Sequence, residues 1–327
     1  MISLLDVAGP LTAIPENRTC AVLADPLSFP ADQGQTHEYA ARKGPDLDMP
    51  QISALVKRHP LTTFFILAYA LSWWAWILYA LGLFPNPIAS FGPFLAAIVV
   101  LALTEGKAGL LGLFRRMVRW RIPPGWYVVA LLLPAVLAAA ATVLNVLLGA
   151  EPPSAAELNG WTGLFAIFAI VLVVPGLGGA WEEPGWRGYA LPRLQSRRSA
   201  LVASLILGAL IAGWHLPLMV AGQVAYSDIV LIFAGTIVYN WVFNNARGSV
   251  LIIMVMHAAN NTISGSFFSP MFTGADSVRQ SWMLALVWTV VAILVILISG
   301  PEHLSRKYRK QEEALPDSEA VPNRRGA

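Results

Sequence analysis

Two adjacent glutamates, Glu182 and Glu183, precede Arg187 in a part of the chain that is otherwise largely apolar. Glu183 and Arg187 are four residues apart, so in a helix both side chains lie on one face within reach of a salt bridge. Glu182 is then left without a cation. An unpaired carboxylate in a low-dielectric place suits a general acid or base that works near neutral pH. The alternative is a helix-end charge cluster at the membrane surface.

A second polar pair, His257 and Asn261, has the same four-residue spacing, so both side chains face the same neighbour. An imidazole and a carboxamide can bind a metal, hold a water or donate to a developing oxyanion. They can also form an interhelical hydrogen-bonded pair that only joins helices. A third polar residue in the apolar part of the chain is His215. Taken alone, it would be interpreted as a histidine at the end of a helix.

The composition places these residues inside a membrane. Of 327 residues, 56% are hydrophobic and 13% charged, against roughly 25% charged in a soluble domain. Long uncharged runs exclude soluble enzyme folds, collagen and disorder as the main class. The pI near 9.1 reflects a net charge of only +3, so we expect no nucleic-acid partner. The single cysteine, Cys20, excludes an intrachain disulfide.

The apolar runs predict an all-α polytopic membrane bundle of about eight transmembrane helices. Several runs fall short of the ~20 residues that cross a bilayer, so their ends must include flanking polar positions. The expected spans are Thr62 to Leu83, Phe91 to Thr104, Trp126 to Gly149, Trp161 to Gly179, Leu201 to Trp214, Ile229 to Phe243, Val250 to Phe267 and Ser281 to Ser299.

Lys and Arg gather in alternate connections between these spans, with Arg279 as the exception. Positive charge marks the cytoplasmic side, so we expect an integral protein of the plasma membrane with both termini cytoplasmic. Residues 1–58 are predicted to be a poorly ordered extension, 59–300 the membrane domain and 301–327 a polar tail. The change of composition after Met49 makes it an alternative start to Met1.

The spacing also predicts that Glu182 and His215 face each other. Arg197 and Arg198 mark a cytoplasmic tip, 15 residues after Glu182 and 17 residues before His215. In two antiparallel helices these offsets are about 22 and 26 Å, which puts both side chains at similar depth. His257 follows Arg247 by 10 residues and so enters from the same side.

Three motifs resemble those of the CPBP intramembrane proteases, which include type II CAAX prenyl endopeptidases and bacteriocin-immunity or Abi proteins. The motifs are Glu182-Glu183-x-x-x-Arg187, Ile211-x-x-x-His215 and His257-x-x-x-Asn261, within about residues 160–265. The first and third match fully. The family usually has Phe where this chain has Ile211, and Trp186 replaces the commoner Phe before the arginine.

The resemblance implies an intramembrane endopeptidase that hydrolyses a peptide bond of a membrane-associated substrate. By that resemblance Glu182 and His215 would activate water, while His257 and Asn261 would stabilise the oxyanion or bind a metal. Glu183 and Arg187 would fix the geometry.

The four residues Glu182, His215, His257 and Asn261 could hold a divalent metal such as Zn²⁺ with one open position, although asparagine is a poor zinc ligand. Water activated by glutamate without metal is the alternative. The competing functions are a transporter or proton-coupled carrier, since intramembrane Glu and His also relay protons, and a non-catalytic scaffold or immunity protein of the same fold.

Overall fold

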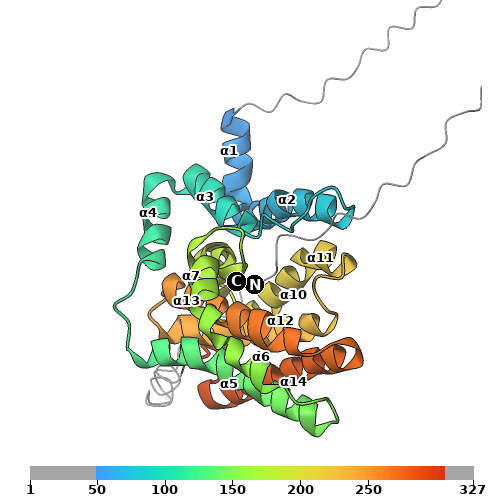
Figure 1. Cartoon of the computed structure of the whole chain (residues 1–327). Helices are drawn as coiled ribbons and strands as arrows, with labels where there is room; N and C mark the ends of the chain where they lie inside the picture. Colours follow the sequence, from blue (N-terminus) through green and yellow to red (C-terminus); the bar gives the residue numbers. More distant parts are fainter. Residues whose placement is uncertain (1–48, 306–327) are drawn as a thin grey trace, which may run out of the picture. The chain divides into compact units, whose positions relative to one another are not determined.

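The computed structural model describes residues 49–305, and within that range every regular element is helical (Figure 1). The expectations for a poorly ordered stretch before residue 49, for the choice of start and for the tail beyond residue 305 lie outside the described residues. The elements are α1 Met49–Arg58, α2 Pro60–Ala80, α3 Gly92–Thr104, α4 Gly106–Met117, α5 Gly125–Leu147, α6 Ala155–Leu158, η1 Asn159–Gly163, α7 Leu164–Val173, η2 Gly179–Glu182, α8 Glu183–Gly185, η3 Trp186–Ala190, α9 Leu191–Gln195, α10 Ala200–Trp214, α11 Leu216–Val220, α12 Ser227–Asn245, α13 Val250–Asn260, η4 Asn261–Phe268, η5 Ser269–Met271 and α14 Gly274–Ser299.

Within the described residues, six helical stretches are long and apolar enough to cross a membrane, and α3 and α10 are shorter apolar helices. Together they correspond to the eight expected spans, so the polytopic helical bundle is confirmed. The long stretches are Pro60–Ala80, Gly125–Leu147, Ala155–Val173, Ser227–Asn245, Val250–Met271 and Gly274–Ser299. The protein is therefore an integral membrane protein.

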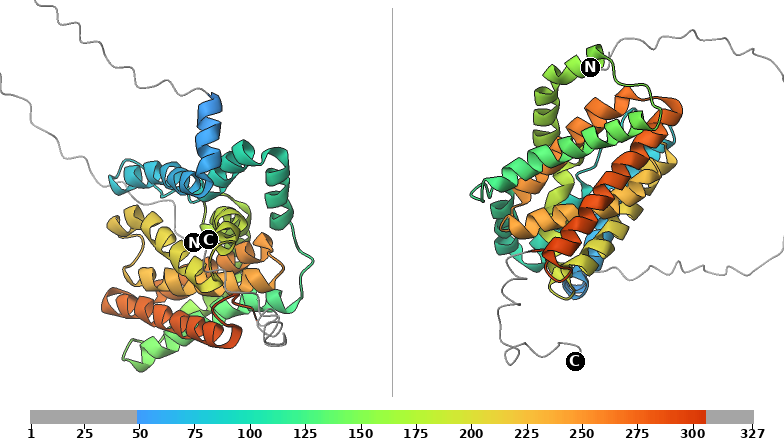
Figure 2. Two further views of the ribbon diagram at one scale, coloured as in Figure 1. Left: turned by 180° about the vertical axis from the view of Figure 1, so that it is seen from behind. Right: turned by 90° about the horizontal axis from the view of Figure 1, so that it is seen from below.

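Helix α12 lies between α10 and α14, and α5 packs against both α13 and α14 (Figure 2). The helices α2 and α3 pack on each other, and α3 also contacts α8. The short helices that carry the first motif are thereby held between the α2–α3 pair and α13. This packing places motif residues that are far apart in the sequence around one interior space.

Two predicted boundaries are wrong. The poorly ordered extension was expected to reach residue 58, but residues 49–58 form helix α1. Val56 of this helix packs into the core at 5% exposure. The span expected to reach Gly179 leaves the helix after Val173. Val174, the residue before Pro175, is extended, and Gly176 has φ +87°, a left-handed conformation that a helix does not contain.

The basic connections meet at one end of the bundle. Arg116 donates to the carbonyl of Gly188, and Arg119 donates to the carbonyl of Arg247. Arg193 forms an ion pair with Glu105. The connections before α5 and before α13 are thus close in space, and one pocket lined by Arg197, Arg198 and Arg247 brings the connection before α10 to the same end.

Candidate active site

All six residues singled out from the sequence line one cavity of about 370 Å³. They are Glu182, Glu183, Arg187, His215, His257 and Asn261. Glu182 and His215, expected from their spacing to lie at similar depth, are thus both in the walls of this cavity. The remaining walls come mainly from α12, η4 and α14, and they include both apolar and hydroxyl side chains.

Glu183 and Arg187 form the predicted ion pair. Arg187 Nη1 lies 3.1 and 3.0 Å from the two carboxylate oxygens of Glu183. Both side chains are buried, with Glu183 0% and Arg187 3% exposed. The guanidinium also lies over the ring of Tyr239, 5.2 Å from its centroid. A buried ion pair is retained only where further hydrogen bonds satisfy its remaining atoms.

Glu183 also holds His257, a contact that spacing alone could not predict. The imidazole Nδ1 lies 2.7 Å from Glu183 Oε1. A carboxylate only accepts hydrogen bonds, so Nδ1 carries the proton and Nε2 is the nitrogen left for chemistry. The ring of Tyr239 meets the imidazole edge to face, with 5.7 Å between centroids. One carboxylate thus orients both a cation and an imidazole.

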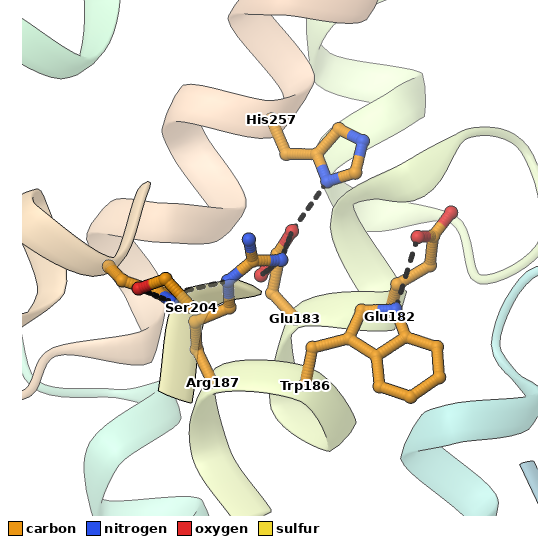
Figure 3. A network of polar contacts seen from close by, with 7 residues as sticks. Glu182, Glu183, Trp186, Arg187, Ser204 and His257 are labelled. Carbon is orange, nitrogen blue, oxygen red and sulfur yellow. Dashed lines mark hydrogen bonds and ion pairs between the residues drawn. The ribbon is translucent and has the colours of Figure 1, made fainter. Parts of the chain in front are cut away.

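Two buried residues that sequence reasoning missed, Asn240 and Ser204, extend this network. Figure 3 shows Ser204 on the side of Arg187 that is away from Glu182. Arg187 Nε donates to Asn240 Oδ1 at 3.1 Å, and Asn240 Nδ2 donates to Ser204 Oγ at 2.8 Å. Ser204 in turn donates to the carbonyl of Ala200. Asn240 lies in a predicted span, so its position in an apolar run was the signal that could have identified it.

Glu182 lies apart from these contacts, although it is only 6% exposed. Figure 3 shows its carboxylate directed away from the Glu183–Arg187 pair. The hydrogen bond found for it among the described residues is from Trp186 Nε1, at 3.4 Å. Trp186 is itself buried and meets Trp214 edge to face, 5.5 Å between centroids. Within residues 49–305, Glu182 is therefore a buried carboxylate that forms no ion pair.

His215 follows the end of α10 and lines the cavity. Its Nδ1 lies 2.9 Å from the carbonyl oxygen of Ile211. A carbonyl also only accepts, so Nδ1 is protonated and Nε2 of the neutral ring is an acceptor. The rings of Trp76 and Trp214 lie against the imidazole, with 6.1 and 4.8 Å between ring centroids. These contacts fix which nitrogen can take a proton.

Two π-helical turns place motif residues at the cavity. Arg187 lies in η3, and Asn261 begins η4. The wider turn of a π-helix changes the direction of side chains and is frequent at functional sites. The third motif therefore changes from α to π geometry between His257 and Asn261.

A glycine in η2 allows His257 its position. A Cβ atom on Gly179 would overlap the imidazole at Nε2 and Cε1. The backbone of η2 thus passes directly against the ring, and this close approach requires a residue without a side chain. The short helix that ends in Glu182 is held close to His257.

The donors do not fit the zinc site considered above. Within residues 49–305, no three His, Cys, Asp or Glu side chains form a group that could hold a metal ion. Glu182, His215 and His257 line one cavity without meeting at a common point, and Glu183 is occupied by Arg187 and His257.

Comparison with known proteins agrees with the motifs. Residues 161–263 match the family model of type II CAAX prenyl endopeptidase Rce1-like proteins. CAAX prenyl protease 2 of Methanococcus maripaludis is 30% identical over 145 residues, which cover 40% of this chain and 52% of that protein. The chain thus spans about half the length of the curated relative that it matches.

The matched region contains Glu182, His215, His257 and Asn261, so the family model covers the same part of the chain as the three motifs. It also contains Asn240 and Ser204, which support Arg187. Residues 161–263 are thus similar to the type II CAAX prenyl endopeptidase Rce1-like proteins over the part of the chain that carries the three motifs.

Proposed function

We propose that this protein is an intramembrane endopeptidase that hydrolyses a peptide bond of a membrane-associated substrate with water activated by Glu182. The observation that carries the proposal is the buried, cation-free carboxylate of Glu182 in a cavity that also contains the acceptor nitrogen of His215. General base catalysis needs such a group within reach of the water.

In the proposed reaction a water molecule lies between Glu182 and His215. Glu182 takes one proton from it, and the oxygen forms a bond to the carbonyl carbon of the substrate. His215 accepts the second hydrogen in a hydrogen bond through Nε2 and so orients the water. When the tetrahedral intermediate collapses, the C–N bond breaks and Glu182 returns its proton to the leaving amine.

The oxyanion of the intermediate is proposed to face His257 and Asn261. The amide of Asn261 donates without any change of protonation. A protonated His257 donates through Nε2, and the neighbouring carboxylate of Glu183 favours that charged form. Arg187, Asn240 and Ser204 do not touch the substrate in this scheme, and they position Glu183.

We also propose that the basic end of the bundle faces the cytoplasm in the plasma membrane. The connections with Arg119, Arg197 and Arg247 lie together there, and positive residues remain on that side during insertion. Both termini would then be cytoplasmic. Accessibility of an introduced cysteine at position 247 to a membrane-impermeant reagent tests this orientation.

The decisive test compares the purified wild type with Glu182→Gln on a library of membrane peptides, farnesylated and unmodified C-terminal peptides included. The reaction is run in water enriched in ¹⁸O, and products are identified by mass spectrometry. Cleavage by wild type with one ¹⁸O in the new carboxyl, and none by the variant, is expected. Equal cleavage by both proteins would overturn the mechanism.

Absence of cleavage by both, in well-folded protein, would favour a carrier or a scaffold instead. Solute flux into proteoliposomes then separates these two.

A further inference from the structure

One face of α12 forms a continuous wall of the cavity. Its cavity-lining residues recur at helical spacing and are Asp228, Leu231, Ile232, Gly235, Thr236 and Tyr239. The two ends of this series are 11 positions apart, which is about 16 Å along a helix. An extended peptide rises about 3.3 Å per residue, so this wall can contact about five residues of a substrate.

The two ends of the wall differ in chemistry. At one end Tyr239 lies against His257, 5.7 Å between ring centroids, so this end adjoins the proposed reaction site. At the other end stands the carboxylate of Asp228, with Leu231 and Ile232 between them. A substrate lying along α12 would place an apolar segment on the middle of the wall and a different side chain at Asp228.

Asp228 has no ion-pair partner among the described residues. Its Oδ2 accepts a hydrogen bond from the backbone N–H of Ala225 at 3.0 Å. The cationic side chains that line the same cavity are Arg187 and His257, and both are bound to Glu183. The cavity therefore presents two carboxylates without a cation in residues 49–305, Glu182 and Asp228.

The wall of the same cavity also contains a buried donor without a partner among the described residues. Trp288 of α14 lines the cavity at 1% exposure, and its Nε1 has no hydrogen-bond partner in the described part of the chain. A buried unsatisfied donor costs free energy unless a ligand or water meets it.

We propose that Asp228 selects substrates with a Lys or Arg side chain within about five residues of the scissile bond. The cationic group would form an ion pair with the Asp228 carboxylate at the far end of the α12 wall. A free terminal carboxylate at this position would be repelled, because it carries the same sign of charge. This substrate class rests on the proposed peptidase function and narrows it.

The test uses the full chain in lipid nanodiscs and peptides that differ at one position. Each peptide carries Lys, norleucine or Glu at one of five positions on either side of the cleaved bond. We expect wild type to prefer Lys over norleucine about tenfold in kcat/KM at one position, and to disfavour Glu there, since a hydrogen bond between charged groups has this magnitude.

The informative variant is Asp228→Asn, which keeps an oxygen for the Ala225 N–H. It should abolish the preference for Lys while the rate on the norleucine peptide stays within about twofold of wild type. The matched control is Asp276→Asn, since Asp276 is paired with Arg279 outside the cavity. It should retain the preference.

Equal loss on Lys and norleucine peptides in Asp228→Asn, or no preference in wild type, would overturn the role of Asp228 while leaving the peptidase in place. Binding separates the two proposals further. Dissociation constants of the same peptides are measured for Glu182→Gln and for Glu182→Gln with Asp228→Asn. Binding that prefers Lys through Asp228, without cleavage by wild type, would contradict the peptidase and support the selectivity.

Discussion

The cavity has two halves that use the same kinds of side chain in opposite ways. In one half Glu183, Arg187, Asn240 and the Nδ1 atom of His257 are joined by hydrogen bonds of 2.7 to 3.1 Å. In the other half Glu182 has a 3.4 Å contact from Trp186 as its hydrogen bond within residues 49–305. Two neighbouring carboxylates in one sequence motif therefore have different environments.

The difference teaches which polar groups can react. A carboxylate that already accepts from a guanidinium and an imidazole is stabilised as an anion and is a poor proton acceptor. A buried carboxylate without a cation keeps its capacity to take a proton. Substitutions in the paired half should act on stability and geometry, whereas substitutions in the open half should act on the chemical step.

The largest effect is expected for Glu182→Gln. The variant removes the general base and keeps the size of the side chain, so kcat should fall on the order of 10³-fold or more. The melting temperature should stay close to that of wild type, because Glu182 has no ion pair to lose within the described structure. Peptide cleavage and a thermal shift assay measure the two quantities.

The exposed Glu151 provides the control for this variant, since Glu151→Gln removes a carboxylate outside the cavity. It should leave kcat unchanged. A Glu182→Gln protein that melted much earlier than wild type would mean that both halves of the cavity are structural.

The next effect concerns the paired half. Arg187→Met leaves the buried Glu183 with no guanidinium, and breaking a buried pair in this way costs about 3–5 kcal/mol. The melting temperature should fall by many degrees. Arg193→Met is the control, because its ion pair with Glu105 is partly exposed and contributes about 1 kcal/mol or less. Equal shifts in the two variants would contradict the buried role of Arg187.

The sequence was sufficient to predict the membrane spans and the contacts between residues that are close together on one helix. The Glu183–Arg187 pair lies within one helical turn, and the spans follow from hydropathy, so both could be predicted. The contacts from His257 to Glu183 and from Asn240 to Arg187 join residues on different helices. They depend on how helices pack, and spacing within one helix carries no information about that packing.

The end of the fourth span shows a second limit. Hydropathy favoured a helix up to Gly179, but Pro175 and the left-handed Gly176 end it earlier. This break frees the segment that places Gly179 against His257. An apolar run does not reveal where the backbone leaves the helix to approach another residue.

The next substitution, Gly179→Ala, should affect both halves of the cavity. Gly179 begins the short helix that ends in Glu182, and its Cβ would overlap the imidazole of His257. The ring must move, and a displacement of about 1 Å at a catalytic group can cost on the order of 10²-fold in rate. Gly163→Ala is the control, since a Cβ on Gly163 meets nothing within 4 Å. We expect cleavage to fall in Gly179→Ala alone; activity within twofold of wild type would show that the ring tolerates the shift.

A smaller effect is expected for Asn240→Ala. It leaves Arg187 Nε without its acceptor, which costs about 1–3 kcal/mol in a buried site. We expect kcat to fall about tenfold, because Arg187 then holds Glu183 less precisely in place. KM should change little. The control is Asn244→Ala, because Asn244 lies on the same helix and does not line the cavity. This variant should keep the wild-type kcat. A normal kcat with a lowered melting temperature would restrict Asn240 to stability.

The smallest effect is expected for metal removal. Glu182, His215 and His257 share a cavity without forming a three-ligand group, and Glu183 is already bound. A zinc enzyme needs three protein ligands and an open position. Prolonged treatment with a chelator should therefore leave kcat/KM within about twofold, and metal analysis should give far less than one ion per chain. Activity that disappears with the chelator and returns with Zn²⁺ would mean that these three side chains move together around an ion, and the open half of the cavity would then be a metal centre.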